Sequence, residues 1–250
     1  MAVAKRAQVC NQVGTEPSLD LMISVVIPTL NAQATLGATL AALVPAVVDG
    51  LVREVIVVDG GSTDDTERIV DIAGATFLSA PKGRGGQLAA GARQARFPWL
   101  LFLHADTVLQ PGWEREAQTF IERIDSGRRE PSAAAFRFAL DDSGVRARLL
   151  EKLVRLRCLL FRMPYGDQGL LLTVALYRSL GGYKDIPLME DVDFVRRLGA
   201  RRLTFLRSEA VTSAERYRSG GYVRRSLRNL MCFSLYLLRV PPGVIARLYG

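Results

Sequence analysis

The stretch LLFLHADT, residues 100–107, is an apolar run that ends abruptly in a histidine and a carboxylate. It is short, carries no charge before that end and lies between Pro98 and Pro111, which is typical of a strand buried on both faces of a sheet. Its polar end would then lie at the carboxyl edge of the sheet, where open α/β sheets bind ligands. His104 and Asp106 are therefore candidate site residues, and a strand followed by an ordinary Asp-Thr turn is the alternative.

Two similar β-branched runs occur earlier in the chain. ISVVIP at residues 23–28 is stopped by Pro28, and EVIVVD at residues 54–59 ends in a carboxylate, Asp59. Helical periodicity follows each run, and this alternation predicts a right-handed, parallel α/β sheet. The expected elements are strands over residues 23–28, 54–59, 76–78 and 100–103, with helices over 32–44, 62–73 and 87–96 between them.

The loops after the first two strands carry residues that favour helix starts. Asn31 can cap the helix over residues 32–44, which would end before Pro45. Ser62 and Asp65 have the spacing of a capping box for the next helix. The sequence therefore predicts that both loops end in capped helices.

A basic, glycine-rich segment, KGRGGQ at residues 82–87, precedes the third helix. Such a segment at a helix start can bind phosphate through its backbone amides, or it can be an ordinary turn. It is not a P-loop, because its lysine precedes the glycines.

The strand-helix alternation ends after Pro111. Residues 145–163 predict a basic amphipathic helix that either covers the sheet or contacts a membrane surface. Three acids, Glu190, Asp191 and Asp193, lie at the start of another predicted helix, where the helix dipole alone would also favour them. The remaining expected elements are a helix to about residue 124, an extended segment over 133–140, a loop over 163–169 and a strand over 203–206.

Charge is distributed unevenly along the chain. The 250 residues carry a formal net charge of +8, and residues 196–250 contain twelve arginines against two acids. Such a basic segment indicates an anionic partner, which could be nucleotide phosphates, a lipid surface or nucleic acid. The single histidine excludes sites built on two or more histidines and leaves carboxylates as the expected ligands or bases.

Cysteine usage and apolar runs bear on the compartment. Three widely spaced cysteines suit neither a disulfide framework nor a zinc cluster, which favours a reducing cytosol. The longest late apolar run, residues 230–238, is far shorter than the roughly 20 residues that span a bilayer, although it can lie along an interface. Residues 1–21 are expected to be a disordered leader. We expect a cytoplasmic protein, with peripheral binding to the inner face of the membrane as an option.

Four motifs occur in order: SVVIPTLN at 24–31, VVDGGSTD at 57–64, LHAD at 103–106 and ED at 190–191. With them, about residues 22–210 resemble the family 2 glycosyltransferases, which have the GT-A fold, a Rossmann-like, mixed and mainly parallel α/β sheet flanked by helices. The chain looks most similar to short, single-domain bacterial members with His-Ala-Asp-Thr in place of Asp-x-Asp. The resemblance implies a glycosyltransferase domain over 22–215, with a nucleotide-binding half (22–110) and an acceptor half (111–215), and a basic, apolar helical segment over 216–250.

The resemblance also implies roles for residues of the nucleotide-binding half. Asp59 would hold the base or ribose of the nucleotide. Asp106 would ligate Mg²⁺ or Mn²⁺ on the diphosphate, because hard cations prefer carboxylate and phosphate oxygens. His104 replaces the first aspartate of the family motif, and it would bind ribose, touch the metal or only pack. The wall of the nucleotide pocket would contain Pro28, Thr29 and Asn31.

Further implied roles concern the transfer itself. Asp191 matches the catalytic base of the family, and its neighbour Glu190 is the second candidate. Gln168 matches a loop on the acceptor side. The expected diphosphate contacts are Arg84, Arg216 and Arg218.

The implied function is a metal-dependent, inverting transfer of a sugar, of hexosyltransferase type, from a nucleotide-diphospho-sugar to a hydroxyl acceptor. A lipid-linked or amphiphilic acceptor and a homodimer are options. A nucleotidyltransferase of related fold is the alternative enzyme, but such enzymes place a glycine-rich basic loop directly after the first strand, where this chain has PTLN at 28–31. A nucleic-acid-binding protein would explain the arginines but not the carboxylates at successive strand ends.

Overall fold

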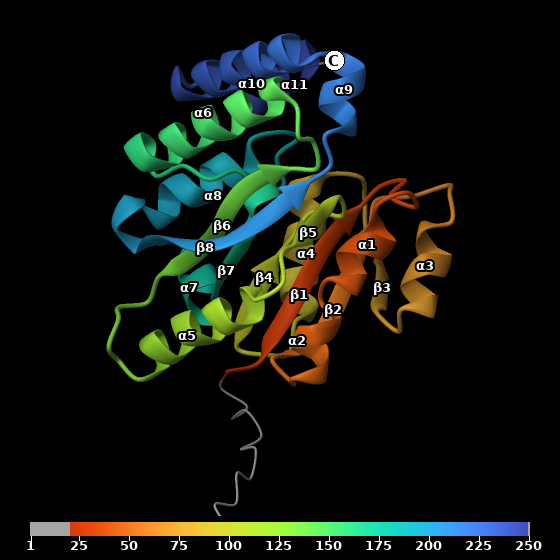
Figure 1. Cartoon of the computed structure of the whole chain (residues 1–250), viewed down its shortest axis with the longest axis vertical. Coiled ribbons are helices and arrows are strands. Elements are labelled where there is room, and N and C mark those ends of the chain that lie inside the picture. The colour runs from red at the N-terminus through yellow and green to blue at the C-terminus, as the bar shows by residue number, and fades with distance from the viewer. Residues whose placement is uncertain (1–20, 250) are drawn as a thin grey trace, which may run out of the picture.

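Eight strands form one sheet in the order β3-β2-β1-β4-β7-β6-β8-β5 within residues 21–249, the part of the chain that the computed structural model describes (Figure 1). β1 to β4 are parallel to one another, and β6 is parallel to β8. β7 is antiparallel to both of its neighbours, β4 and β6, and β5 is antiparallel to β8. The expected mixed, mainly parallel sheet is confirmed. The expected leader, residues 1–21, lies outside the described residues except for Leu21. The strands are β1 Ile23–Thr29, β2 Val52–Asp59, β3 Thr76–Ser79, β4 Trp99–Phe102, β5 Thr107–Leu109, β6 Ala133–Leu140, β7 Leu170–Thr173 and β8 Leu203–Thr212.

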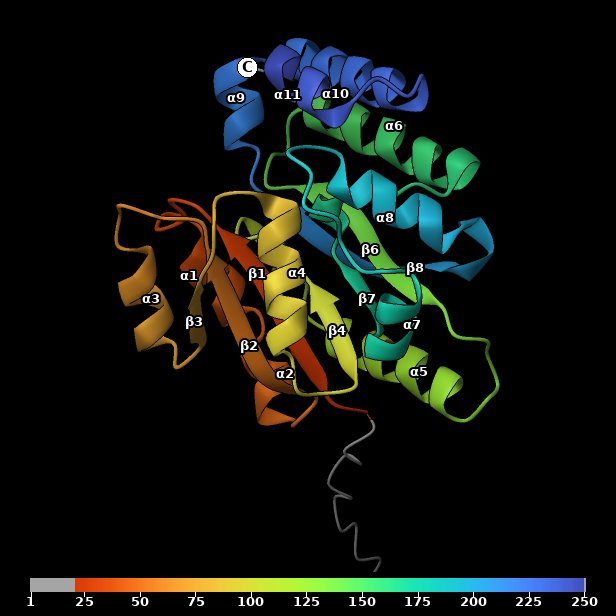
Figure 2. The ribbon, with the colours of Figure 1, turned by 180° about the vertical axis from the view of Figure 1, so that it is seen from behind.

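The central strands are buried on both faces, as their apolar runs predict. On β4, Leu101 packs into one hydrophobic core, and Leu100 and Phe102 pack into the core on the opposite face. Alternate side chains of a strand point to opposite faces, so a run without polar residues needs a helix layer on each side. Figures 1 and 2 show these two layers from opposite sides. One contains α1 (Leu36–Ala41), α2 (Val44–Val48), α3 (Thr66–Ile72) and α5 (Trp113–Asp125), and the other contains α4 (Arg84–Gln94), α7 (Val174–Ser179) and α8 (Glu190–Leu198).

The remaining helices gather at one end of the molecule (Figures 1 and 2). They are α6 (Val145–Phe161), α9 (Glu215–Gly220), α10 (Tyr222–Leu237) and α11 (Pro242–Tyr249). α6 packs on β6 over a small third core that includes Phe138, Leu140, Ala147 and Ala214. Within residues 21–249, none of the helices combines the length and the apolar character that crossing a bilayer requires.

Several expected helix boundaries are wrong, and the cause is local. The helix expected over residues 32–44 is two short helices, because the chain turns between them and Pro45 lies in the first turn of α2. Asn31 has a φ of 51° and accepts a hydrogen bond from the Thr63 amide instead of capping α1. Ser62 does not cap α3, since its hydroxyl donates to Asp59. These polar side chains join two loops, a tertiary role that spacing alone does not reveal.

Candidate active site

Two cavities adjoin each other at the carboxyl ends of β1 and β4. One, called here the large cavity, has a volume of about 670 Å³. The other, called here the acidic cavity, has a volume of about 140 Å³. Arg84, His104, Asp106 and Arg216 line both, so a ligand in one cavity can reach groups in the other. Other predicted residues in the wall of the large cavity are Pro28, Thr29 and Asn31.

Side chains tie the loops after β1 and β2 into one unit, called here the loop pair. The Asn31 amide donates to Ser62 Oγ over 2.7 Å, and the Thr63 amide donates to Asn31 Oδ1 over 2.9 Å. The Gln33 amide donates to Asp64 Oδ2 over 3.0 Å. The wall of the large cavity is therefore fixed by bonds between residues about 30 positions apart in the chain.

Asp59 belongs to the support of the loop pair. Its Oδ2 accepts from the backbone amides of Gly61 and Ser62, and its Oδ1 accepts from the hydroxyls of Thr29 and Ser62. Burial alone would raise the pKa of Asp59, but these hydrogen bonds hold it below the usual value. Asp59 is not among the described residues that line either cavity, and its carboxylate supports the tight turn at Gly61, whose φ is 93°. Its contact with the nucleotide stays a prediction.

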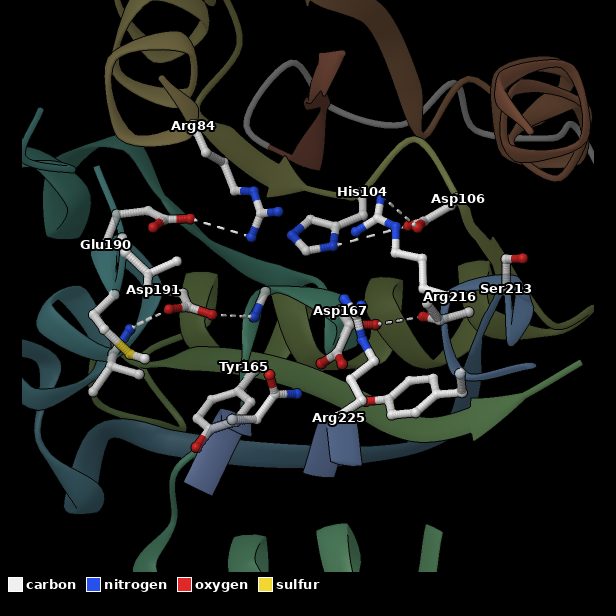
Figure 3. Close-up of a pocket in the computed structure, with 17 residues that line it drawn as sticks. Arg84, His104, Asp106, Tyr165, Asp167, Glu190, Asp191, Ser213, Arg216 and Arg225 are labelled. Carbon is white, nitrogen blue, oxygen red and sulfur yellow. Dashed lines mark hydrogen bonds and ion pairs between the residues drawn. The ribbon is translucent and has the colours of Figure 1, made fainter. Parts of the chain in front are cut away.

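Carboxylates and guanidinium groups face each other across the acidic cavity (Figure 3). Arg216 Nη2 lies 3.2 Å from Asp106 Oδ2, and Arg84 Nη1 lies 3.4 Å from Glu190 Oε1. Arg84 begins α4 and Arg216 lies in α9, so both arginines come from elements other than the loop between β4 and β5 that carries Asp106. The cavity can neutralise a ligand of either charge by exchanging these internal pairs for contacts to the ligand.

His104 lies between Arg84 and Arg216 in the lining shared by the two cavities (Figure 3). Burial, followed by the positive charges of Arg84 and Arg216, lowers its pKa well below the usual value. The imidazole is therefore neutral at physiological pH and can accept a hydrogen bond or ligate a metal through one nitrogen. Its Nδ1 lies 4.0 Å from Asp106 Oδ1.

Glu190 and Asp191 begin α8, after Met189 has reversed the chain with a φ of 67°. Asp191 Oδ2 accepts a hydrogen bond of 2.8 Å from the Gly166 amide, which orients its carboxylate in the cavity. Glu190 is almost fully buried, and burial and the adjacent charge of Asp191 raise its pKa to about 7 against the opposing effect of Arg84. The pair therefore contains one oriented carboxylate and one that exchanges its proton near neutral pH.

Asp167 is a site residue that the sequence did not single out. It lies in the cavity lining beside Tyr165 and Gly166, and burial raises its pKa to about 6. Its Oδ1 atom has no solvent contact and no hydrogen-bond partner within residues 21–249. Such an orphaned buried oxygen indicates a group that a ligand would satisfy.

Glycines let α4 approach the segment before α8 closely. A side chain at Gly85 would overlap the carbonyl oxygen of Lys184 and press against Glu190. The glycine-rich segment at 82–87 is therefore the first turn of a helix packed against the site, and it places Arg84 over the acidic cavity. Phosphate binding by this segment stays a prediction.

The C-terminal helix α10 forms another wall that the sequence did not predict. Arg225 and Asn229 of α10 line the acidic cavity. Phe233 packs on Tyr165 with the ring centroids 6.1 Å apart, and Cζ of Arg157 in α6 lies 3.5 Å from the centroid of the Tyr165 ring. Helical periodicity shows that 222–237 is amphipathic, but it cannot show which neighbour the polar face meets.

Besides Asp59, two predicted site residues lie outside both cavities. Gln168 is buried, donates to the Phe136 carbonyl over 2.9 Å and accepts from Cys158, so it supports the loop whose neighbouring residues line the acidic cavity. Arg218 pairs with Asp141 and Asp142 instead of approaching the cavities. The acceptor-side role of Gln168 and the diphosphate contact of Arg218 stay predictions.

The residues present fit a divalent cation that also uses ligands from a substrate. Asp106 supplies carboxylate oxygens and neutral His104 can supply one nitrogen, whereas no group of three or more acidic, histidine or cysteine side chains suited to a metal exists within residues 21–249. Mg²⁺ and Mn²⁺ are commonly held by one or two carboxylates together with phosphate oxygens and water. The donor set at Asp106 therefore suits such an ion only with a diphosphate in the adjoining cavity.

The sequence of this region has known relatives. Residues 24–143 match the model of glycosyl transferase family 2. The chain carries a family 2 glycosyltransferase domain. Over 95 residues this domain is 37% identical to the glucosyl-3-phosphoglycerate synthase of Mycolicibacterium paratuberculosis, an alignment that covers 34% of this chain and 29% of that protein. Over 126 residues it is 34% identical to a PGL/p-HBAD biosynthesis glycosyltransferase of Mycobacterium bovis, with 44% of each chain covered. The chain thus spans less than half the length of both relatives.

Solved structures extend the likeness of the glycosyltransferase domain to the fold. Glucosyl-3-phosphoglycerate synthase from Mycobacterium tuberculosis, crystallised with Mn²⁺, UDP and glucosyl-3-phosphoglycerate, superposes with a TM-score of 0.51 at 22% identity, over 92% of this chain and 85% of that one. Residues 1–349 of TarS from S. aureus superpose with a TM-score of 0.58 at 18% identity, over 77% and 60%. The fold is therefore the GT-A fold of these glycosyltransferases, as the resemblance implied.

Proposed function

We propose that the chain is a metal-dependent, inverting glycosyltransferase that moves a sugar from a nucleotide-diphospho-sugar to a hydroxyl group. One observation carries the proposal: the large cavity meets the acidic cavity at Asp106, His104, Arg84 and Arg216. A nucleotide in the first would place its diphosphate at these groups and its sugar beside Asp191. The ligands in crystal structures of the related synthase, UDP with Mn²⁺ or Mg²⁺, support this donor class.

The proposed transfer assigns one step to each part of the cleft. Asp191 takes the proton of the acceptor hydroxyl while its oxygen attacks the anomeric carbon and the bond from that carbon to the diphosphate breaks on the opposite side. Arg84 and Arg216 bind the diphosphate as its negative charge grows. Asp106 with His104 would hold a Mg²⁺ or Mn²⁺ ion, which neutralises charge on the leaving group.

The acceptor and the cellular location of the enzyme belong to the same proposal. Phosphoglyceric acid is a ligand of a related structure, and the guanidinium of Arg225 in the acidic cavity suits such an anion. A lipid-linked acceptor at the inner face of the membrane is the other expected class, and a homodimer stays a prediction.

Thermal shift with nucleotides and nucleotide sugars tests the donor site. We expect UDP and UDP-glucose to raise Tm more with Mn²⁺ than without it, and slow hydrolysis of the bound sugar nucleotide when no acceptor is present. Stabilisation by a nucleoside triphosphate together with pyrophosphate release from a sugar phosphate would identify a nucleotidyltransferase instead. No nucleotide response with Mn²⁺ would overturn the proposal.

A further inference from the structure

Three helices at one end of the molecule present apolar side chains to solvent. On α6, Leu159 and Phe161 are exposed, and five further exposed side chains recur every three or four residues and so lie in one stripe along the helix. Their exposed fractions run from 49% at Leu156 to 86% at Val145, far above those of core leucines. This surface, called here the apolar face, contains Val145, Leu149, Leu153, Leu156 and Leu160 of α6, Val223, Leu227, Leu230, Met231 and Leu237 of α10, and Val244 and Leu248 of α11.

The orientation of α10 is the reverse of that of an ordinary surface helix. Its polar residues Arg225 and Asn229 face the acidic cavity, whereas Leu227 and Leu230 are 61% and 59% exposed. A helix of a monomeric soluble protein usually turns its apolar stripe inward. An apolar stripe of this length left outside marks an interaction surface.

The charge around the apolar face selects the partner. α6, α10 and α11 together carry nine lysines and arginines but a single acid, Glu151. That acid is already engaged, since its Oε1 accepts from Arg148 and from the Leu140 amide. Arg146, Lys152, Arg155 and Arg224 are exposed on these helices, so the face combines leucines with an excess of positive charge, the composition of helices that lie in the plane of an anionic bilayer.

We propose that the apolar face docks on an anionic lipid bilayer, with α6 and α10 lying along the headgroup layer. A second copy of this chain fits the face poorly, because a symmetric contact would bring the exposed cations of the two copies together. Nucleic acid would satisfy the cations and leave the leucines exposed. A bilayer satisfies both, since acyl chains receive the leucines and anionic headgroups receive the arginines.

Docking would also place the acidic cavity beside the membrane. Arg225 and Asn229 lie on the inner side of the helix whose outer side carries the apolar face, so about one helix diameter, roughly 10 Å, separates the cavity from the lipid. A membrane-borne acceptor could then present its hydroxyl to Asp191. This step rests on the proposed transferase function, whereas binding to the bilayer does not.

Vesicle flotation with the full chain tests the docking independently of catalysis. We expect the protein to float with phosphatidylcholine vesicles that contain phosphatidylglycerol, to stay behind with pure phosphatidylcholine, and to be released by high salt. Absence from the anionic vesicles at low salt would overturn the proposal, whatever the outcome of the donor experiments.

Matched variants separate the two contributions. The combination Leu153→Ser, Leu156→Ser and Leu230→Ser removes apolar surface, and the control Val47→Ser, Val48→Ser and Ile72→Ser does the same on α2 and α3. We expect the first set to weaken partition by about tenfold or more, given the free energy of exposed leucines, and the control to leave it unchanged. Equal loss of vesicle binding in both sets would show that nonspecific hydrophobic contact, and not this face, binds lipid.

A charge set completes the test. Arg146→Glu, Arg155→Glu and Arg224→Glu reverse exposed cations of α6 and α10, and Arg53→Glu, Arg123→Glu and Arg128→Glu change the net charge equally elsewhere. Only the first set should abolish binding to anionic vesicles. Circular dichroism verifies folding of each variant. A dimer in solution that the leucine set dissociates, with no vesicle binding, would assign the face to a second copy and refute the bilayer.

Discussion

At the scale of single residues, Asp106 holds the central position in the cleft. Its carboxylate lies between Arg216, 3.2 Å away, and His104, so the ion that we propose would have to displace a guanidinium. An internal cation at this point keeps the carboxylate oriented while no metal is bound. The same arrangement gives Arg216 a negative partner until a diphosphate replaces it.

Asp106→Ala should abolish the stimulation of turnover by Mn²⁺, because no other carboxylate occupies this strand end. The measurement is hydrolysis or transfer at increasing Mn²⁺, with His104→Asp as the comparison, since it restores the common family motif and should retain metal-dependent activity. An Asp106→Ala enzyme that still responds to Mn²⁺ would remove this residue from the metal site.

Asp191→Asn should lower kcat by about 10²-fold or more and leave nucleotide affinity nearly unchanged, as expected when a general base is lost. The Gly166 amide can still donate to the oxygen of an asparagine, so the local geometry is preserved. Calorimetric titration of UDP and steady-state kinetics measure the two quantities. Normal kcat would move the assignment to Glu190.

The raised pKa of Glu190 predicts that kcat/KM changes with pH near neutrality. Its pKa is raised to about 7, so below that pH it takes a proton and its ion pair with Arg84 is lost. We expect kcat/KM to fall as pH decreases through about 7, and Glu190→Gln, which cannot ionise, to lack this limb. A limb that persists in the variant would trace to another group.

The sequence predicts the backbone position of a site residue better than the direction of its side chain. Strand ends place Asp106 and His104 at the sheet edge whatever their rotamers, and the structure finds both in the cavities. Asp59 and Gln168 also lie in sequence motifs, but the carboxylate of Asp59 and the amide group of Gln168 form hydrogen bonds within the protein that stabilise neighbouring loops. A motif gives the backbone position of a residue, whereas its contacts depend on segments far away in the chain.

At the scale of elements, helix α4 illustrates how packing overrides local preference. Glycine is unfavourable within a helix, yet Gly91 lies in the middle of α4 because any side chain there would overlap Val26 of the sheet. The close approach brings the start of α4, and with it Arg84, to the cleft. Local propensity predicts a weak helix here, and the contact with β1 and β2 supplies its stability.

Gly91→Ala should destabilise the fold by about 1–3 kcal/mol through overpacking against the sheet. Gly37→Ala is the matched control, since Gly37 lies in α1 with open space around it, and it should stabilise by about 0.5–1 kcal/mol. Urea denaturation measures both. Equal effects of the two substitutions would contradict the packing argument.

The expected elements were most accurate for the buried strands and least accurate for helix ends. Both faces of β1, β2 and β4 are covered, so their apolar runs have one physical solution. The split between α1 and α2 depends on the loop pair, whose bonds reach across about 30 positions. β8 extends to Thr212, well beyond the expected 203–206, because β6 and β5 pair with its polar half.

At the scale of the whole molecule, the cleft stores unfavourable electrostatic energy. Asp167 is buried near Asp106 and Asp191, and its pKa of about 6 exceeds the ordinary value of 3.8. Between these pH values the folded chain holds a proton that the unfolded chain has released, so the stability contributed by this group falls as pH rises and is lowest above about 6.

Asp167→Asn should therefore raise Tm at pH 8, by about 2–4 °C if the gain is about 1 kcal/mol, because the variant keeps no buried charge. The gain should vanish near pH 4, where wild-type Asp167 is protonated in the folded state. Melting curves across this pH range provide the test. A gain that is constant with pH would point to packing instead of ionisation.

The loop pair also determines where binding entropy is lost. Its backbone amides already have partners in the chain, since the Asn31 amide donates to Ser62 Oγ and the Thr63 amide donates to Asn31 Oδ1. A nucleotide that enters the large cavity therefore meets a wall that is already ordered. The side chains left to immobilise are the arginines, and each rotamer-rich side chain that is fixed costs about 0.5–1.5 kcal/mol. Affinity for the donor is then limited by the number of guanidinium groups that must leave their internal carboxylates, and the acceptor meets a cleft in which this ordering is already complete.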